Sequence, residues 1–327
     1  MPDFYNVCII GGGPSGHSAA LYTSRSMLKT ILFEGIDNPG GQLTQTTDVE
    51  NYLGFPDGIN GYELCIKFKE QSERWGTNVI SEYAEKIVYN NNDEYKFNVY
   101  YDDLNKYIST KTIIICTGSS AKTLIFDGSD TFWNRGITSC AVCHGALPMF
   151  RNKPLFVIGG GDTAMEDALY LSRYTNDVYI VHRRDSFRAS KVMQQRVLKN
   201  ENIKILWNTE IVKAYKKYRN DENDENLDTV VLRNNIDETI TEYNSGGVFY
   251  AIGHSPSTYF LKNSKINIDL DEDGYIITKP DSTQTNIPGI FCAGDVRQSD
   301  KKFKQAIVAA GNGCKAALEC IDFIENI

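Results

Sequence analysis

Two glycine-rich turns, each between an apolar run and a stretch suited to a helix, constrain the fold of this chain most strongly. The first, GGGPSG at residues 11–16, follows VCII and precedes HSAALYTSRS. The second, GGGDTA at residues 159–164, follows LFVI and precedes MEDALYLSRY. In a strand–turn–helix unit, such glycines let the backbone approach a pyrophosphate, and the helix N-terminus directs free N–H groups at it. The chain is therefore predicted to be an α/β protein with two Rossmann-like dinucleotide-binding domains.

The first turn has an acidic residue at the end of the strand that follows its helix. Gly11, Gly13 and Gly16 have the G-x-G-x-x-G spacing, and the apolar run TILF ends in Glu34, 18 residues after Gly16. A carboxylate at that position can accept hydrogen bonds from ribose hydroxyls. The glycine loop alone does not separate FAD from NAD. Two later strand ends, TGS at 117–119 and FCAGD at 291–295, favour FAD.

The second turn has basic residues at the corresponding strand end. The run DVYIV leads into HRRDSFR at residues 182–188, where an NAD site would have an acid. Arginine side chains there suit the 2′-phosphate of NADPH through charge-assisted hydrogen bonds; the alternative is a solvated basic turn. The candidate NADPH contacts are Gly159, Gly161, Asp162, Thr163, His182, Arg183, Arg184 and Arg188.

Two of the eight cysteines, Cys140 and Cys143 in SCAVCHG, have a motif spacing. They form either a redox pair or two buried thiols that share a loop. No second CxxC or CxxH follows at zinc-finger distance, so no metal is expected. Cys143 precedes ALPMF and is expected at a helix N-terminus, where the dipole lowers a thiol pKa. Structural roles are expected for other cysteines: Cys8 and Cys116 in strands, and Cys314 and Cys320 on a helix.

Composition limits the classes of partner and location. The net charge of −8 argues against nucleic acid or an anionic membrane surface as the main partner. No apolar run approaches the roughly 18 residues that a membrane span needs. The start MPDFYN lacks the pattern of a secretory signal, so a cytoplasmic location is expected. The acidic run at residues 220–228 is expected to be a solvated hairpin tip.

Taken in order, the motifs resemble those of the low-molecular-weight thioredoxin reductases, class II of the FAD- and NADPH-dependent pyridine nucleotide-disulfide oxidoreductases. Ferredoxin-NADP reductases of similar fold lack the cysteine pair. The resemblance covers nearly the whole chain. The matching segments are GGGPSG, GGQLTQTTDVENYLGFP, TIIICTGS, SCAVCHG, GGGDTAMEDA, HRRDSFRA, FYAIGHSP and IPGIFCAGD.

The resemblance implies an FAD domain, residues 1–118 and 250–327, interrupted by an NADPH domain, residues 119–249, that carries the cysteine pair. Lys304 stands where the family commonly has arginine, which keeps the charge but loses the planar fork. Ordinary capping of loop backbone is the alternative role for Gln42 and Asn51. The implied FAD contacts are Gly11, Gly13, Pro14, Ser15, Gly16, Glu34, Gly41, Gln42, Asn51, Asp295, Lys304, Gln305 and Ala306.

The resemblance also implies the route of the electrons: from NADPH to FAD, to the Cys140–Cys143 disulfide, and to oxidised thioredoxin. Cys143 would face the flavin, and Cys140 would attack the substrate disulfide. His144 stands where the family usually has the aspartate that handles protons for the dithiol. A histidine can do the same near pH 7. The alternative is that His144 faces solvent and has no catalytic role.

The implied assembly is a homodimer formed by the FAD domains. The NADPH domain would rotate about connections near 118–121 and 246–250, with Gly118, Gly246 and Gly247 as hinges. The pattern CxxCH also occurs in related fungal dithiol oxidases that use oxygen, so an FAD-dependent dithiol oxidase is the second candidate function. Those relatives tend to lack a usable NADPH pocket, whereas both NADPH motifs are intact here. A flavoprotein that senses redox state without turnover is the third.

Overall fold

The computed structural model describes residues 3–46, 48–90, 94–217 and 225–326. The chain divides into two compact units. The first unit comprises Met1–Ser120 and Ser255–Ile327, and the second comprises Ala121–His254. The sequence placed the breaks after residues 118 and 249. The second of these positions falls inside a strand of the second unit, β17 (Gly247–Tyr250). The assignment of FAD to the first unit and NADPH to the second stays a prediction.

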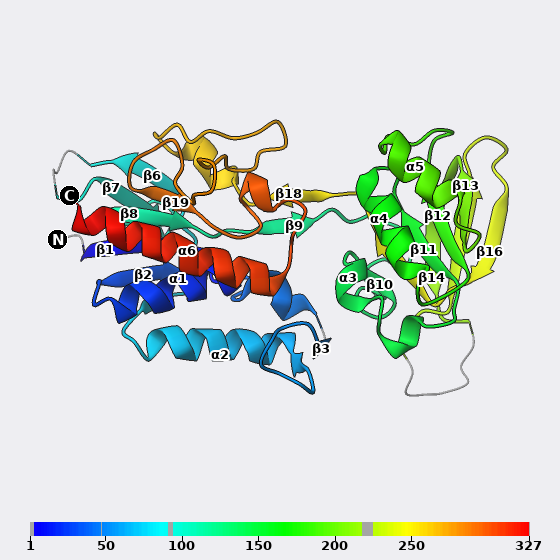
Figure 1. Ribbon diagram of the computed structural model, residues 1–327, viewed down its shortest axis with the longest axis horizontal. Coiled ribbons are helices and arrows are strands. Elements are labelled where there is room, and N and C mark those ends of the chain that lie inside the picture. Colours follow the sequence, from blue (N-terminus) through cyan, green and yellow to red (C-terminus); the bar gives the residue numbers. More distant parts are fainter. Residues whose placement is uncertain (1–2, 47, 91–93, 218–224, 327) are drawn as a thin grey trace. The chain divides into compact units, whose positions relative to one another are not determined.

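The first unit is built on a seven-stranded sheet in which β7 pairs antiparallel with both β6 and β8, and all other neighbouring strands pair in parallel (Figure 1). The order is β5-β2-β1-β8-β7-β6, and β19 pairs with β8. The sheet strands are β1 (Asp3–Ile10), β2 (Thr30–Phe33), β5 (Asn78–Ile80), β6 (Lys86–Tyr89), β7 (Phe97–Tyr101), β8 (Lys106–Ile115) and β19 (Ile290–Cys292). The remaining elements are α1 (Pro14–Arg25), η1 (Gly41–Gln45), β3 (Asp48–Val49), β4 (Ile59–Asn60), α2 (Gly61–Glu73), η3 (Tyr259–Asn263), η4 (Gln298–Asp300) and α6 (Ala306–Glu325).

Strand β1 shows why this sheet is buried on both faces. Successive side chains of a strand point to opposite sides. Val7 and Ile9 pack with the alanines of α1 and α6, which lie side by side on one face (Figure 1). Cys8 and Ile10 pack on the other face with residues from β6, β7 and the segment before β19. A strand with two buried faces reads as a continuous apolar run, as VCII does.

The second unit contains a five-stranded parallel sheet, in the order β10-β17-β11-β12-β13, and a three-stranded antiparallel sheet, β14-β15-β16. Leu155 and Val157 of β11 pack against α4, while Phe156 and Ile158 pack against the antiparallel sheet. The strands are β10 (Ile137–Thr138), β11 (Leu155–Ile158), β12 (Val178–His182), β13 (Ile203–Trp207), β14 (Thr209–Tyr215), β15 (Thr229–Asn234), β16 (Ile240–Asn244) and β17. The helices are α3 (Ala141–His144), η2 (Pro148–Phe150), α4 (Asp162–Leu171) and α5 (Lys191–Leu198).

The chain passes between the units through two short strands, β9 (Ser119–Ala121) and β18 (His254–Pro256), which pair with each other. Gly118 lies beside this crossing, as expected. The expected hinge at Gly246 and Gly247 is wrong, because Gly247 begins the buried strand β17. Gly253, with a φ of 93° and open space where a Cβ would lie, is the glycine next to the second crossing.

Three further segments can be compared with the expectations. The helix after the second glycine turn ends at Leu171, although its pattern continued to residue 174. The last helix, expected to carry Cys314 and Cys320, begins at Ala306, because Gln305 before it is extended. The acidic run does lie between two antiparallel strands, β14 and β15. Its residues 220–224 lie outside the described residues, and Leu227 near its end is buried. Across the described ranges, no helix is both long and apolar enough to cross a membrane.

Candidate nucleotide and disulfide sites

The first glycine turn forms an open cradle at the N-terminus of α1. A Cβ on Gly11 would lie 2.3 Å from the carbonyl oxygen of Cys116, and one on Gly16 would lie 1.8 Å from that of Gly11. Beside Gly13, by contrast, the nearest atom is 3.8 Å away. Gly13 is also the N-cap of α1 and supplies no side-chain cap. The first N–H groups of the helix are thus available to a phosphate.

The second glycine turn repeats this arrangement at α4. A Cβ on Gly159 would lie 2.5 Å from the carbonyl oxygen of Ala251, whereas nothing lies within 4 Å of one on Gly161. Gly161 is the N-cap of α4, again without a side-chain cap. The third position of the motif holds Ala164, which is buried. Both turns therefore have the shape that a dinucleotide pyrophosphate requires.

Glu34 is buried at the end of β2 and is held by two donors. Its Oε1 accepts hydrogen bonds from Lys69 Nζ at 2.8 Å and from Ser81 Oγ at 2.6 Å. Lys69 comes from α2, and Ser81 follows β5. Sequence reasoning missed both donors, because they lie 35 and 47 residues from Glu34 along the chain. The carboxylate expected to bind a ribose is thus already oriented.

Four of the residues expected to contact FAD come together through hydrogen bonds near the end of β8. Lys304 Nζ donates to Ser119 Oγ at 3.0 Å and to the hydroxyl of Tyr275 at 2.7 Å. The Gln42 amide donates to the carbonyl oxygen of Ser119. A further bond joins Asn51 Nδ2 to Gln305 Oε1 at 3.1 Å.

Burial shifts the pKa values of two charged groups in this part of the first unit, and one buried hydroxyl lacks a partner among the described residues. Burial raises the pKa of Asp295 to about 6, although Lys304 opposes the shift. Burial lowers the pKa of Lys304 to about 8, although Asp295 opposes this shift. The hydroxyl of Thr117 is buried and has no hydrogen-bond partner within the described ranges. With the open cradle and Glu34, these groups fit a ligand that carries phosphates, ribose and further polar atoms, as FAD does.

The arginines at the end of β12 differ from Glu34 in being unheld. Arg183, Arg184 and Arg188 are exposed, and none forms an ion pair with a described residue. His182 is buried instead, and a Cβ on Gly160 would lie 2.2 Å from its Cε1. Its Nε2 lies 3.0 Å from the carbonyl oxygen of Ser186. His182 therefore supports the glycine turn from behind.

Asp162, the first residue of α4, connects that helix to the segment after the arginines. Its Oδ1 accepts hydrogen bonds from Ser190 N at 2.8 Å and Ser190 Oγ at 2.9 Å. Ser190 is the N-cap of α5. Thr163, the residue after Asp162, is exposed. Asp162 thus keeps the arginine segment next to the glycine turn, and direct contacts of Asp162, Thr163 and His182 with NADPH stay predictions.

Cys140 and Cys143 form a disulfide with an S–S distance of 2.01 Å. The expected position of Cys143 at the N-terminus of a helix is wrong. Cys143 is the third residue of the single-turn helix α3, and Cys140 is its N-cap. Cys140 Sγ accepts a hydrogen bond from Cys143 N at 3.1 Å. The chain does not continue as a helix through ALPMF, because Pro148 begins a separate 3₁₀ turn.

His144 is half-buried and hydrogen-bonded rather than directed into solvent. Its Nδ1 lies 2.7 Å from Thr138 Oγ1, and its backbone N–H donates to the carbonyl oxygen of Cys140 at 3.2 Å. Burial lowers the pKa of His144 from its usual value. Sequence reasoning missed Thr138, although it precedes Cys140 by only two residues. A catalytic role for His144 stays a prediction.

Of the cysteines expected to have structural roles, Cys8 lies in a strand and Cys314 and Cys320 lie on a helix, as expected, whereas Cys116 lies just after its strand. Cys8 lies in β1, Cys116 follows β8, and both are buried. Cys320 of α6 is buried too, and Cys314 of the same helix is half-buried. Burial raises the pKa of Cys116 and Cys320 to about 12, so their reactive thiolate forms are scarce near pH 7.

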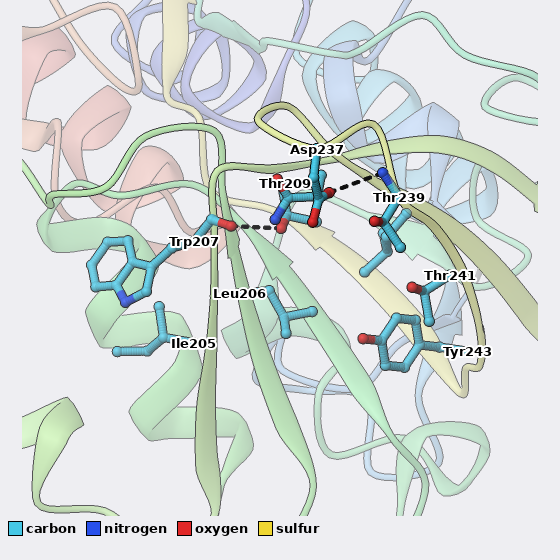
Figure 2. Close-up of a pocket in the computed structure, with 10 residues that line it drawn as sticks. Ile205, Leu206, Trp207, Thr209, Asp237, Thr239, Thr241 and Tyr243 are labelled. Atoms are coloured by element: carbon cyan, nitrogen blue, oxygen red, sulfur yellow. Dashed lines mark hydrogen bonds between the residues drawn. The ribbon is translucent and has the colours of Figure 1, made fainter.

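A pocket of about 260 Å³ lies in the second unit between β13 and the antiparallel sheet (Figure 2). Its polar groups largely satisfy one another: Thr209 Oγ1 donates to the carbonyl oxygen of Trp207, and Thr239 N donates to Asp237 Oδ1. Among the described residues that line it, Asp237 is the one with a carboxyl group. We assign no chemistry to this pocket.

Comparison with known proteins agrees with the geometry. The chain is 49% identical over 329 residues to "Thioredoxin reductase 2" of Arabidopsis thaliana, covering 98% of this chain and 82% of that protein. It is 46% identical to "Thioredoxin reductase" of Chlamydia trachomatis, covering 97% and 98%. The structure of thioredoxin reductase from Giardia duodenalis matches with a TM-score of 0.90 at 35% identity, covering 99% of both chains.

The match to a family spans almost all of the two units. Residues 5–313 match the pyridine nucleotide-disulphide oxidoreductase family. This range contains both glycine turns and the disulfide. The resemblance inferred from the sequence motifs, and the α/β fold with two dinucleotide-binding domains, are thereby confirmed. The chain belongs to the pyridine nucleotide-disulphide oxidoreductase family.

Proposed function

We propose that this chain is an NADPH-dependent, FAD-containing thioredoxin-disulfide reductase. Its net reaction takes NADPH, a proton and the disulfide of oxidised thioredoxin to NADP⁺ and the dithiol of reduced thioredoxin. The single observation that carries the proposal is the Cys140–Cys143 disulfide in the same chain as two glycine cradles with opposite strand-end charges. The named relatives are thioredoxin reductases, which supports this choice of substrate.

Each cradle has a distinct task in this proposal. The α1 cradle and Glu34 hold FAD, which carries two electrons between the nicotinamide and the disulfide. The α4 cradle binds the pyrophosphate of NADPH, and the exposed arginines bind its 2′-phosphate. The remaining FAD contacts are those expected from the sequence, centred on Gln42, Asn51, Asp295, Lys304 and Gln305.

The disulfide passes the electrons on by thiol–disulfide exchange. Once it is reduced, the Cys140 thiolate attacks a sulfur of the thioredoxin disulfide and forms a mixed disulfide. The Cys143 thiolate then attacks Cys140 Sγ, which restores the internal disulfide and releases reduced thioredoxin. His144 supplies or accepts the proton that this exchange requires.

The test is NADPH oxidation by the purified, FAD-loaded protein, with and without a thioredoxin. The proposal expects oxidation that depends on thioredoxin and is lost in both Cys140→Ser and Cys143→Ser, while FAD remains bound. Equal NADPH oxidation with and without thioredoxin would contradict it. Cys314→Ser is a matched control, because that thiol lies outside the proposed route and should leave the rate unchanged.

The second candidate, an FAD-dependent dithiol oxidase, differs in where electrons enter and leave. An oxidase would take electrons from a dithiol and reduce oxygen, without NADPH. The open α4 cradle and the unpaired arginines favour the reductase, since an oxidase has no use for them. Dithiol-dependent oxygen consumption faster than NADPH-dependent thioredoxin reduction would favour the oxidase instead.

Assembly and location complete the proposal. The protein is a homodimer that associates through its FAD-binding units, which light scattering would test. It works in the cytoplasm, and its six free cysteines beside one redox disulfide suit a reducing compartment. Cell fractionation would test the location, since a second related protein from Arabidopsis thaliana is named mitochondrial.

A further inference from the structure

The hydroxyl group of Thr138 lies between the backbone of the disulfide loop and the ring of His144. Thr138 is the last residue of β10, and its side chain is buried. Its Oγ1 lies 3.4 Å from the backbone nitrogen of Cys140, which donates to it, and 2.7 Å from Nδ1 of His144. Within the part of the chain that the structure describes, these are its two hydrogen-bond partners.

The count of hydrogens decides how these three groups pair. A threonine hydroxyl has one hydrogen and two lone pairs, and a backbone N–H can only donate. The Cys140 N–H therefore occupies a lone pair of Oγ1. If a neutral His144 ring carried its hydrogen on Nδ1, the second lone pair would be used as well. The buried hydroxyl hydrogen would then have no acceptor, which is costly.

The alternative arrangement satisfies all three groups. The hydroxyl donates its hydrogen to Nδ1, and the neutral ring carries its own hydrogen on Nε2. We propose that Thr138 is a positioning residue that fixes the neutral His144 ring in the Nε2–H tautomer. The proposal rests on the proposed function only where it gives His144 a role in the redox site.

The tautomer sets what His144 can do beside the disulfide. In this tautomer the neutral ring carries a hydrogen on Nε2, which it can donate in a hydrogen bond to a sulfur atom or a water molecule. Proton uptake has to occur at Nδ1, and the Thr138 hydroxyl must then turn away from its acceptor. The hydroxyl thus favours the neutral ring, in the same direction as burial does.

The test reads the ring nitrogens directly by long-range ¹H–¹⁵N correlation NMR. The sample is the oxidised, FAD-loaded protein with ¹⁵N-labelled histidine at pH 8, where a ring whose pKa is lowered by burial is neutral. The chain has four histidines, so the His144 signals are assigned by their loss in His144→Gln. The expected spectrum has a hydrogen on Nε2 and none on Nδ1.

Variants at residue 138 show whether the hydroxyl is the cause. Thr138→Ser keeps a hydroxyl and should preserve the pattern of the parent protein. Thr138→Val and Thr138→Ala should shift the tautomer ratio towards Nδ1–H by about two- to tenfold, the worth of one hydrogen bond. Ser139→Ala is the matched control, because it removes a neighbouring hydroxyl that makes no hydrogen bond to His144.

Two results would overturn the proposal: a hydrogen on Nδ1 in the parent protein, or an unchanged ratio in both variants that lack the hydroxyl. The measurement on the parent needs only the assignment variant, His144→Gln, to fold. It also needs no thioredoxin. Failure to reduce thioredoxin would therefore refute the proposed function and leave the tautomer result standing.

Discussion

The two nucleotide cradles share a backbone but differ in how their strand-end side chains are held. In the first unit, Glu34 is buried and already bonded to Lys69 and Ser81. In the second, Arg183 and Arg188 are exposed and unpaired with any described residue. A preorganised group loses little freedom when its ligand binds, whereas free arginine side chains lose much. The first cradle therefore suits a resident cofactor, and the second suits a cofactor that exchanges at every turnover.

The glycine turns show a second difference. Gly16 leaves no room for a methyl group, because a Cβ there would meet the carbonyl oxygen of Gly11. The equivalent position of the second turn holds Ala164, which is buried there with its methyl group accommodated. The first unit also packs α6 beside α1, which adds the alanines of α6 to the same face of the sheet. The first cradle is therefore closed around Gly16, where it admits no side chain.

The largest effect is expected at His144, where a substitution should slow the disulfide step but leave the NADPH step unchanged. His144→Ala should slow thioredoxin reduction by about 10²- to 10⁴-fold, the usual worth of acid–base assistance. Flavin reduction by NADPH in an anaerobic single turnover should stay unchanged. Because burial lowers the pKa of His144, the parent's rate should show an inflection below pH 6.5 that the variant lacks.

His144→Asp is the matched variant, since it returns the family's usual residue with the opposite charge. It should restore much of the rate and alter the pH profile. An alanine variant as fast as the parent from pH 6 to 9 would show that His144 is not needed. Proton supply would then have to come from water or another group.

The next effect tests the exposed side of the comparison. Arg183→Ala and Arg188→Ala should each lower kcat/KM for NADPH by about ten- to a hundredfold, since each loses charged hydrogen bonds worth about 1.5–3 kcal/mol. The constant for NADH should change little. Steady-state kinetics with both cofactors would measure the ratio. A ratio that stays the same in both variants would refute the phosphate assignment, and Lys191→Ala, on the nearby helix α5, serves as the charge control.

These contrasts also show what the sequence could and could not reveal. Local pattern was enough for both cradles, because the strand, the glycines and the helix are contiguous from Val7 to Arg25 and from Leu155 to Leu171. Pattern also found Glu34, the arginines and the cysteine pair, which hold fixed positions relative to those motifs. It could not find Lys69, Ser81 or Tyr275, because only the folded chain brings them to their partners. The hinge at Gly246 and Gly247 failed for the same reason, since a sequence does not show that β17 is a central strand.

The third effect is the loss of stability in acid that comes from a buried histidine on α1, the helix of the first cradle. His17 of α1 is buried, with Nδ1 3.0 Å from Ser72 Oγ of α2, and burial lowers its pKa to about 4. Its neutral form is favoured by folding. The stability it contributes is therefore fully present above pH 6.5 and is lost as pH falls through about 4. A pKa about 2.5 below the reference corresponds to about 3 kcal/mol.

Urea unfolding followed by flavin release, measured between pH 7 and 4, would show this loss. His17→Gln keeps a polar side chain but cannot titrate, so its stability should fall less over the same range. An equal acid dependence in the parent and the variant would mean that other groups are responsible. Both measurements need the FAD-loaded protein, because bound FAD adds to the apparent stability.

The smallest effect tests whether the first cradle is truly preorganised. Lys69 and Ser81 both donate to Oε1 of Glu34, and no described residue donates to Oε2. Oε2 is thereby left for a ribose hydroxyl. Lys69→Met keeps the apolar stem but removes the charge. Ser81 still donates to the buried Glu34, and the contribution of the partly exposed lysine is at most about 1 kcal/mol. The dissociation constant of FAD from the reconstituted protein should rise by about two- to fivefold.

Substitutions in the two cradles should each change the binding of a different cofactor. Lys69→Met should leave KM for NADPH unchanged, just as the arginine variants should leave FAD affinity unchanged. Salt should separate the two cradles in the same way. Exposed charges are screened over about 8 Å at physiological ionic strength, so KM for NADPH should rise with added salt more steeply than the dissociation constant of FAD. If Lys69→Met binds FAD as tightly as the parent, the ion pair does not orient Glu34. The tight closure around Gly16 would then be what distinguishes the resident cofactor from the exchanging one.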